Sequence, residues 1–257
     1  GELSASALST ATACSALSIA ARRAAPDVRD RYEQLIEAGL DWIFARQNSD
    51  GGWGDTDLSV SNISTTMLVK AATVLAGGDS KSASPERATE AAERLARKEA
   101  ESGGRKNSEL RQEALQRAES YIQAQGGIAG LRRRYGKDKT FAVPILTNYA
   151  LAGLCSWSEV SQLPFELACL PQSWYRFARL PVVSYAIPAL VAIGQARWFH
   201  LKSWNPYSRL VRPLAVERSL TVLQKMQPAS GGFLEATPLT SFVVMSLAAI
   251  GRHDHPV

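Results

Sequence analysis

Hydrophobic residues recur every three or four positions along most of the chain, which is the pattern of amphipathic helices. In residues 28–46, for example, apolar positions fall on one side of a helix and charged positions on the other. Strict alternation bounded by hairpin turns is absent from the sequence. The predicted helices cover residues 3–21, 28–46, 62–76, 113–124, 141–155, 158–168, 182–198, 213–226 and 239–250, with Asn62 as the expected N-cap of the helix at 62–76. We therefore expect an all-α protein of antiparallel helix hairpins joined by short turns.

The stretch at about 77–112 has a different character from its surroundings. Apolar residues become rare there, Ala, Glu, Arg and Lys dominate, and a glycine pair stands near each end. Acidic and basic residues are mixed, which argues against an arm that binds nucleic acid. The sequence predicts a solvated helix or a charged linker or insertion in this region.

Composition narrows the class of protein. The chain has 257 residues, of which 46% are hydrophobic and 21% charged, as in ordinary folded proteins. A net charge of +5 does not demand a nucleic acid or a membrane as partner. The widely separated Cys14, Cys155 and Cys169 form no zinc or disulfide pattern, so we expect no metal or cofactor. Without a visible signal peptide or an apolar run of eighteen residues, we expect a cytoplasmic protein without a spanning helix.

One local pattern occurs twice: a helix ends in glutamine, a glycine pair follows, and an aromatic ring comes next. The pattern includes Trp42, Gln47, Gly51 and Trp53 in residues 38–53, and Gln227, Gly231 and Phe233 in residues 218–233. An eroded copy lies at residues 117–128. Glycine can adopt the positive φ that closes a helix, and the glutamine can bond exposed backbone groups. With the ring buried between neighbours, each copy would join one helix hairpin to the next.

This unit resembles the QW motif of squalene–hopene cyclases, oxidosqualene cyclases and related terpene cyclases. Residues 121–128 are also similar to the FIxxxGGI stretch of the bacterial enzymes, and residues 164–179 resemble their Pro-flanked helix and the Trp-containing helix after it. In order, these features are similar to the amino-terminal half of such cyclases. The resemblance implies an α/α barrel, or toroid, over residues 26–257, and a helix in residues 1–25 that associates with a second barrel. The chain departs from the motif at Glu37, where the family usually has Lys or Arg.

Cyclases of this class protonate a polyene or epoxide with an Asp-x-Asp-Asp motif, which this chain lacks. The nearest candidates for catalytic acids are Asp55 and Asp57, but Leu58 stands in the last position. We favour a helix-capping or solvated-loop role for both acids over the role of a divergent proton donor. The resemblance therefore implies a non-protonating barrel that helps to form the substrate cavity. If the full protein is an enzyme, it would be a terpene cyclase or mutase, an isomerase.

The resemblance also implies the partners: a hydrophobic isoprenoid such as squalene, a second barrel domain or chain, and no nucleic acid. Residues 173–180 and 197–204 mix aromatic rings with cations, which suits peripheral contact with a membrane, as in the monotopic cyclases, or snorkelling over a barrel core. The start at Gly1 and the end at Val257 indicate a piece of a longer protein.

Other relatives of the barrel remain as alternatives. The chain could be a non-catalytic isoprenoid-binding or scaffold α/α barrel that has lost its acids. A glycosidase-like barrel would need a pair of cavity carboxylates, and the apolar helices offer few acids. Protein prenyltransferase β-subunits bind zinc through Asp, Cys and His, and the sequence holds no such constellation.

Overall fold

The computed structural model describes residues 5–77, 104–136, 139–170, 186–233 and 236–257. These residues form helices and connecting loops, without a strand among them, which confirms the all-α prediction. The elements are α1 (Ala7–Ala21), α2 (Pro26–Phe44), α3 (Ile63–Ala76), α5 (Gly104–Ala124), α6 (Gly127–Tyr135), α7 (Lys139–Leu151), the 3-10 helix η1 (Phe165–Cys169), α9 (Ile187–His200), α10 (Pro206–Met226) and α11 (Thr237–Ala249).

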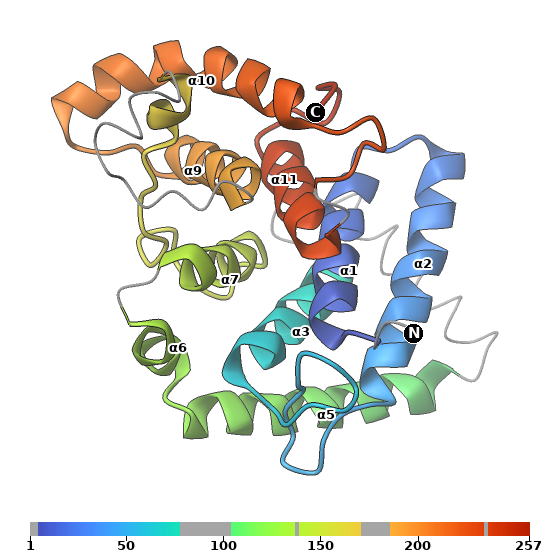
Figure 1. Cartoon of the computed structure of the whole chain (residues 1–257). Helices are drawn as coiled ribbons and strands as arrows, with labels where there is room; N and C mark the ends of the chain where they lie inside the picture. The colour runs from blue at the N-terminus through green and yellow to red at the C-terminus, as the bar shows by residue number, and fades with distance from the viewer. Residues whose placement is uncertain (1–4, 78–103, 137–138, 171–185, 234–235) are drawn as a thin grey trace, which may run out of the picture.

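Five helices make a closed cycle of contacts. In turn, α1 contacts α3, α3 contacts α7, α7 contacts α9, α9 contacts α11, and α11 contacts α1. The remaining helices α2, α5, α6 and α10 lie around the periphery, as Figure 1 shows. Each peripheral helix packs on a neighbour in the cycle or, for α10, also on η1. The hydrophobic core therefore lies among the five helices of the cycle and between them and the outer ones.

The core helix α1 consists mainly of Ala, Ser and Thr and contacts α2, α3 and α11. Small side chains let neighbouring backbones come close, and the contact with α2 illustrates this. A Cβ placed on Gly39 of α2 would lie 2.7 Å from Cys14 Sγ, closer than real Cβ contacts. Within this chain α1 packs into the core formed with α2, α3 and α11, and the association of residues 1–25 with a second barrel stays a prediction.

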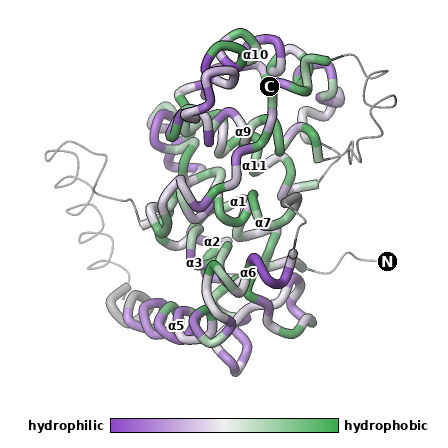
Figure 2. Tube along the Cα trace, turned by 90° about the vertical axis from the view of Figure 1, so that its left-hand side faces the viewer, coloured by the Kyte–Doolittle hydropathy of each residue, from purple (hydrophilic) through white to green (hydrophobic). Residues whose placement is uncertain are grey.

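The outer helix α5 is hydrophilic over most of its length, whereas the helices of the cycle carry the apolar segments (Figure 2). Its buried residues Ala114, Ala118 and Ile122 recur at helical spacing and form its apolar face. Of the charged segment predicted at about 77–112, residues 104–112 are the first half of this helix, and residues 78–103 lie outside the described residues.

The helix predicted at residues 158–168 is wrong. Residues 156–164 form turns and irregular backbone, and a short 3-10 helix begins only at Phe165. The apolar positions that suggested a helix are loop residues whose side chains reach the core, Val160 at 0% and Phe165 at 2% exposure. Conversely, α6 was not predicted, because its last turn is the basic run Arg132–Arg134, which complements the negative end of a helix.

Candidate functional site

The first glutamine–aromatic corner joins α2, α3 and α5. After α2 ends, Gln47 Nε2 donates hydrogen bonds to the carbonyl oxygens of Gly51 and Ala114, both at 2.8 Å. The first bond closes the turn, and the second reaches the middle of α5. Gly51 has a φ of +84°, and a Cβ there would lie 2.8 Å from the Arg117 carbonyl oxygen, so only glycine fits this position without strain.

Trp53 completes the same corner. Its ring is 1% exposed, and its indole N–H donates to the Ile43 carbonyl at the end of α2, at 2.8 Å. Its backbone N–H donates to Thr66 Oγ1 in the first turn of α3, at 3.0 Å. The ring also meets Phe44 edge to face, with 5.9 Å between centroids. Trp53 therefore fixes the end of one helix against the start of the next.

The second corner repeats this geometry between α10 and α11. Gln227 Nε2 donates to the Gly231 carbonyl at 2.8 Å, and Gly231 has a φ of +82°. The buried Phe233 donates its backbone N–H to Thr240 Oγ1 in the first turn of α11, at 2.9 Å. The two corners differ in reach, because the Gln227 bond stays within its own turn and lies at the exposed surface.

The eroded copy and Trp42 stand apart from this bonding pattern. Gly126 and Gly127 have positive φ values between α5 and α6, but Gln123 donates to Glu119 Oε1 one turn back in its own helix. Trp42 is half-buried on α2, where the Arg46 guanidinium lies 4.2 Å from its ring centroid. Its place is the outer side of the corner rather than the hydrogen-bonded turn.

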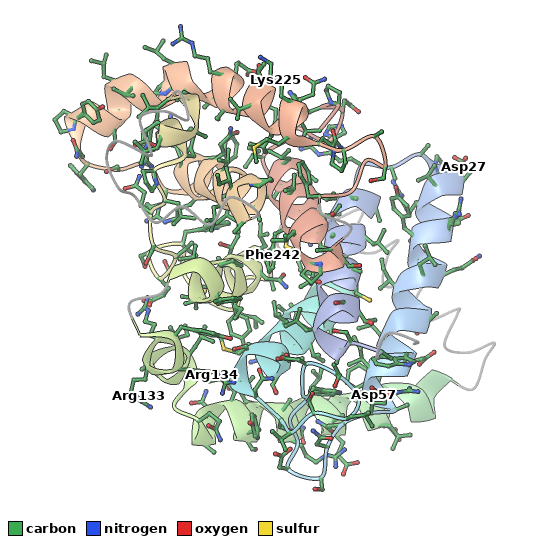
Figure 3. The ribbon with its side chains drawn as sticks, viewed as in Figure 1. Asp27, Asp57, Arg133, Arg134, Lys225 and Phe242 are labelled. Carbon is green, nitrogen blue, oxygen red and sulfur yellow. The ribbon has the colours of Figure 1, made fainter. Side chains whose placement is uncertain are left out.

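The candidate acids lie in the loop that follows the first corner. Asp55 Oδ1 accepts hydrogen bonds from Asn62 Nδ2 at 2.8 Å and from Thr65 Oγ1 at 2.5 Å. Asn62 is the predicted N-cap of α3, and its side chain accepts from the Thr65 backbone N–H, which confirms that prediction. The backbone N–H of Asp57 donates to the Ala5 carbonyl at 3.1 Å, at the lower edge of the molecule in Figure 3.

Through these hydrogen bonds, Asp55 stabilises the N-terminus of α3. A proton donor for an alkene must be a neutral acid in a cavity that excludes water. Asp55 and Asp57 are instead exposed, and Asp55 accepts two hydrogen bonds. In the described part of the chain, no Asp or Glu belongs to the buried residues of the core.

The interior of the helix cycle is crossed by one polar contact. Asn148 Nδ2 on α7 donates to Ser15 Oγ on α1 at 3.1 Å, and both side chains are 0% exposed. These two helices are not neighbours in the cycle of contacts, so the bond spans its interior. Sequence reasoning missed this pair, since the two residues are 133 positions apart in the chain and share no motif.

Exposed apolar side chains gather at the end of α9 and along α10. We define the α9–α10 patch as Phe199, Leu201, Trp204, Tyr207, Leu210 and Leu214, with exposures from 39% to 95%. The exposed Lys202 and Arg209 lie among them in the sequence. Trp204, at 95% exposure, packs on almost nothing within the described chain. Of the two predicted interface stretches, 197–204 contributes to this patch, and 173–180 lies outside the described residues.

Metal and thiol chemistry find little support in the described residues. No group of three or more His, Cys, Asp or Glu there could hold a metal ion. Cys14, Cys155 and Cys169 are free, and burial raises the pKa of the Cys14 and Cys155 thiols to about 11, which keeps them protonated near neutral pH. In the described ranges, no helix has the length and apolar character required to cross a bilayer.

The chain was compared with protein-family models, curated proteins and solved structures. No protein-family model, curated protein or solved structure matches the chain. Any functional conclusion therefore rests on the residues and contacts of the chain itself.

Proposed function

We propose that the chain is an α/α barrel of the squalene–hopene cyclase type, acting as the non-protonating barrel that forms one wall of an isoprenoid cavity. The single observation that carries this proposal is the repeated corner. Four features recur in both copies: a glutamine–glycine bond, a positive-φ glycine, a buried ring, and a bond from the backbone N–H of the aromatic residue to a threonine hydroxyl. Such a unit joins successive helix hairpins, as the cyclase resemblance implies.

The closed cycle of contacts supports the barrel part of the proposal. In an α/α barrel the inner helices contact one another in a ring, and the outer helices cover them. The cycle of α1, α3, α7, α9 and α11, with α2, α5, α6 and α10 around it, has this order. The contact between α11 and α1 is important here, because it brings the last helix back to the first.

The absence of a buried acid in the described core supports the non-protonating part. Its buried polar groups are hydroxyls, amides and one guanidinium, that of Arg212, which pairs with Glu166. None of these groups can protonate an alkene at neutral pH. The acid of a complete cyclase would then come from a second barrel domain or chain.

The α9–α10 patch supports peripheral contact with a membrane, the source of a substrate as apolar as squalene. Aromatic rings and aliphatic side chains mixed with Lys and Arg suit the boundary between lipid and water. Leu210 is 73% exposed and Leu58, on a different loop, is 88% exposed, so they form a matched pair for mutation.

Squalene binding and product analysis test the proposal. Purified chain is mixed with labelled squalene in detergent micelles, and bound and extracted lipids are identified by mass spectrometry. We expect saturable binding and recovery of unchanged squalene. A cyclised product would refute the non-protonating assignment, and a complete lack of saturable binding would refute the isoprenoid role. Binding that is unaltered by an added barrel bearing the Asp-x-Asp-Asp motif would favour the isoprenoid-binding scaffold over the cyclase half.

Vesicle sedimentation tests the membrane surface separately. With vesicles containing anionic lipid, we expect Leu210→Ala to lower the bound fraction about fivefold, because about 1 kcal/mol of apolar burial is lost. Leu58→Ala should leave binding unchanged. Equal effects of the two substitutions would exclude the α9–α10 patch as the contact surface.

A further inference from the structure

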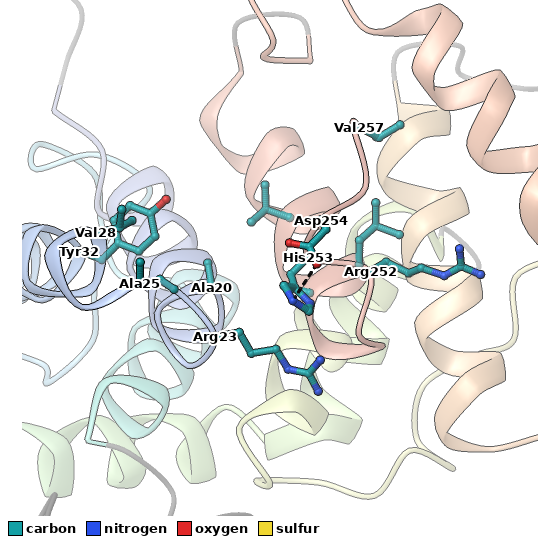
Figure 4. Close-up of a pocket in the computed structure, with 13 residues that line it drawn as sticks. Ala20, Arg23, Ala25, Val28, Tyr32, Arg252, His253, Asp254 and Val257 are labelled. Atoms are coloured by element: carbon teal, nitrogen blue, oxygen red, sulfur yellow. Dashed lines mark ion pairs between the residues drawn. The ribbon is translucent and has the colours of Figure 1, made fainter.

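A pocket of about 400 Å³ opens where α1, α2 and α11 meet the carboxyl-terminal tail (Figure 4). None of the residues that line it belongs to the α9–α10 patch. Its volume lies within the range of sites for small ligands. The end of α1 and the turn after it form one side, the first two turns of α2 a second, and α11 with residues 252–257 the third. Two stretches distant in the sequence, residues 20–32 and 244–257, therefore build one concave surface.

One part of the pocket wall is apolar. Val28 comes from α2, and Val244 and Leu247 come from α11; Ala20 of α1, Ala248 of α11 and the turn residues Ala24 and Ala25 also line the pocket. Val28 is 37% and Val244 38% exposed, so both present accessible apolar surface. A hydrocarbon stem lying there would remove that surface from water.

The other part of the wall is polar and carries Arg23, Arg252, His253 and Asp254. Arg23 and His253 reach into the space between α1 and α11 (Figure 4). Arg252 also lines the pocket but pairs with Glu217, and His253 Nε2 lies 3.2 Å from Asp254 Oδ2. Arg23 forms no ion pair with a carboxylate of the described residues, although its Nη1 lies near the backbone of Gly251 at the end of α11. A guanidinium in this position can bind a carboxylate or a phosphate through two parallel hydrogen bonds.

We propose that this pocket binds a single-chain amphiphile with an anionic head, the head at Arg23 and the stem against Val28, Val244 and Leu247. The ligand class differs from the neutral isoprenoid of the proposed function, and the pocket uses other residues, so either proposal can fail alone. Two sources share this chemistry: a fatty acid, with a carboxylate head, and an isoprenoid phosphate.

Titration calorimetry with four probes tests the head and the stem separately. Oleate and farnesyl phosphate, each below its micelle concentration, carry both parts, whereas farnesol lacks the anion and inorganic phosphate lacks the stem. We expect one molecule of oleate or farnesyl phosphate to bind per chain. The amphiphile that binds more tightly shows whether the pocket prefers a carboxylate or a phosphate head group. Farnesol and inorganic phosphate should bind at least tenfold more weakly. Phosphate or farnesol binding as tightly as the amphiphiles, or no binding of either amphiphile, would overturn the proposal.

Substitutions locate the site. Arg23→Ala should weaken amphiphile binding about tenfold, as expected for the loss of a charge-assisted hydrogen bond, and Arg23→Lys, which keeps the charge but not the two parallel donors, should weaken it less. Arg133→Ala removes an equal charge from the exposed face of α6 and should have no effect. If Arg23 serves only to complement the end of α11, Arg23→Ala will lower the melting temperature and leave the affinity unchanged, and the proposal fails.

Discussion

Replacing Gln47 by the nearly isosteric methionine tests whether the first corner holds an outer helix in place. The substitution removes two hydrogen bonds of 2.8 Å, to the carbonyls of Gly51 and Ala114. Each bond contributes about 1 kcal/mol net. Gln47 Oε1 is buried without a hydrogen-bond partner in the described structure, and its removal offsets part of the loss. We therefore expect a net destabilisation of about 1 to 2 kcal/mol.

The matched substitution Gln227→Met provides the control. Gln227 makes one such bond, within its own exposed turn, so we expect a loss of about 0.5 kcal/mol or less. Urea unfolding followed by circular dichroism measures both free energies. Hydrogen exchange adds the location, because Gln47→Met should loosen α5 around Ala114 while Gln227→Met leaves α5 protected. Equal costs for the two substitutions, or unchanged exchange in α5, would refute the idea that the first corner fastens a distant helix.

Three further substitutions probe other contacts. Trp53→Phe removes the hydrogen bond from the indole N–H to the Ile43 carbonyl and should lower the free energy of urea unfolding by about 2 to 3 kcal/mol. A loss below about 1 kcal/mol would contradict the importance of that bond. Arg212→Met should lower the free energy of unfolding by about 3 to 5 kcal/mol, because it leaves the partly buried Glu166 without its ion-pair partner. Adding Glu166→Gln should restore much of that loss. A double variant no more stable than Arg212→Met alone would argue against the importance of the ion pair. Burial raises the pKa of the Cys14 thiol to about 11, so the folded chain resists its ionisation, and stability should fall as pH rises above about 9, where the unfolded thiol ionises. The difference in unfolding free energy between wild type and Cys14→Ala, measured from pH 7 to 10.5, should shrink by up to about 2 kcal/mol, and a constant difference would contradict the burial effect.

Local signals in the sequence predicted much of the fold because they act within one or two turns of helix. Asn62 was predicted as an N-cap and caps α3, since a short polar side chain before an apolar helix has few other uses. The helix bounds near Pro26 and Gly77 follow from the same local punctuation. Apolar spacing misled at residues 158–168, because a loop whose side chains reach the core has the same composition as a helix face.

Contacts between distant segments were beyond such reasoning. The bond from Gln47 to the Ala114 carbonyl joins residues 67 positions apart, and the pattern around Gln47 indicates only that it can bond a backbone group. The amphiphile pocket likewise combines Arg23 with His253, which share no motif. Even the exposure of Trp204 depends on how α9 and α10 meet, since the same tryptophan would be buried if a neighbouring helix covered it.

The Asn148–Ser15 contact helps to set the alignment of α1, together with the bonds from Ser6 Oγ to the Asp55 carbonyl and from Cys14 Sγ to the Ile36 carbonyl. Along α1 the small side chains are so alike that sliding or turning the helix would change its apolar packing only modestly. Any such slip would leave the Asn148 amide without a hydroxyl in a dry interior, at a cost of about 1 to 3 kcal/mol. The amide therefore adds a directional constraint on the register of α1, which apolar packing of small side chains supplies only weakly.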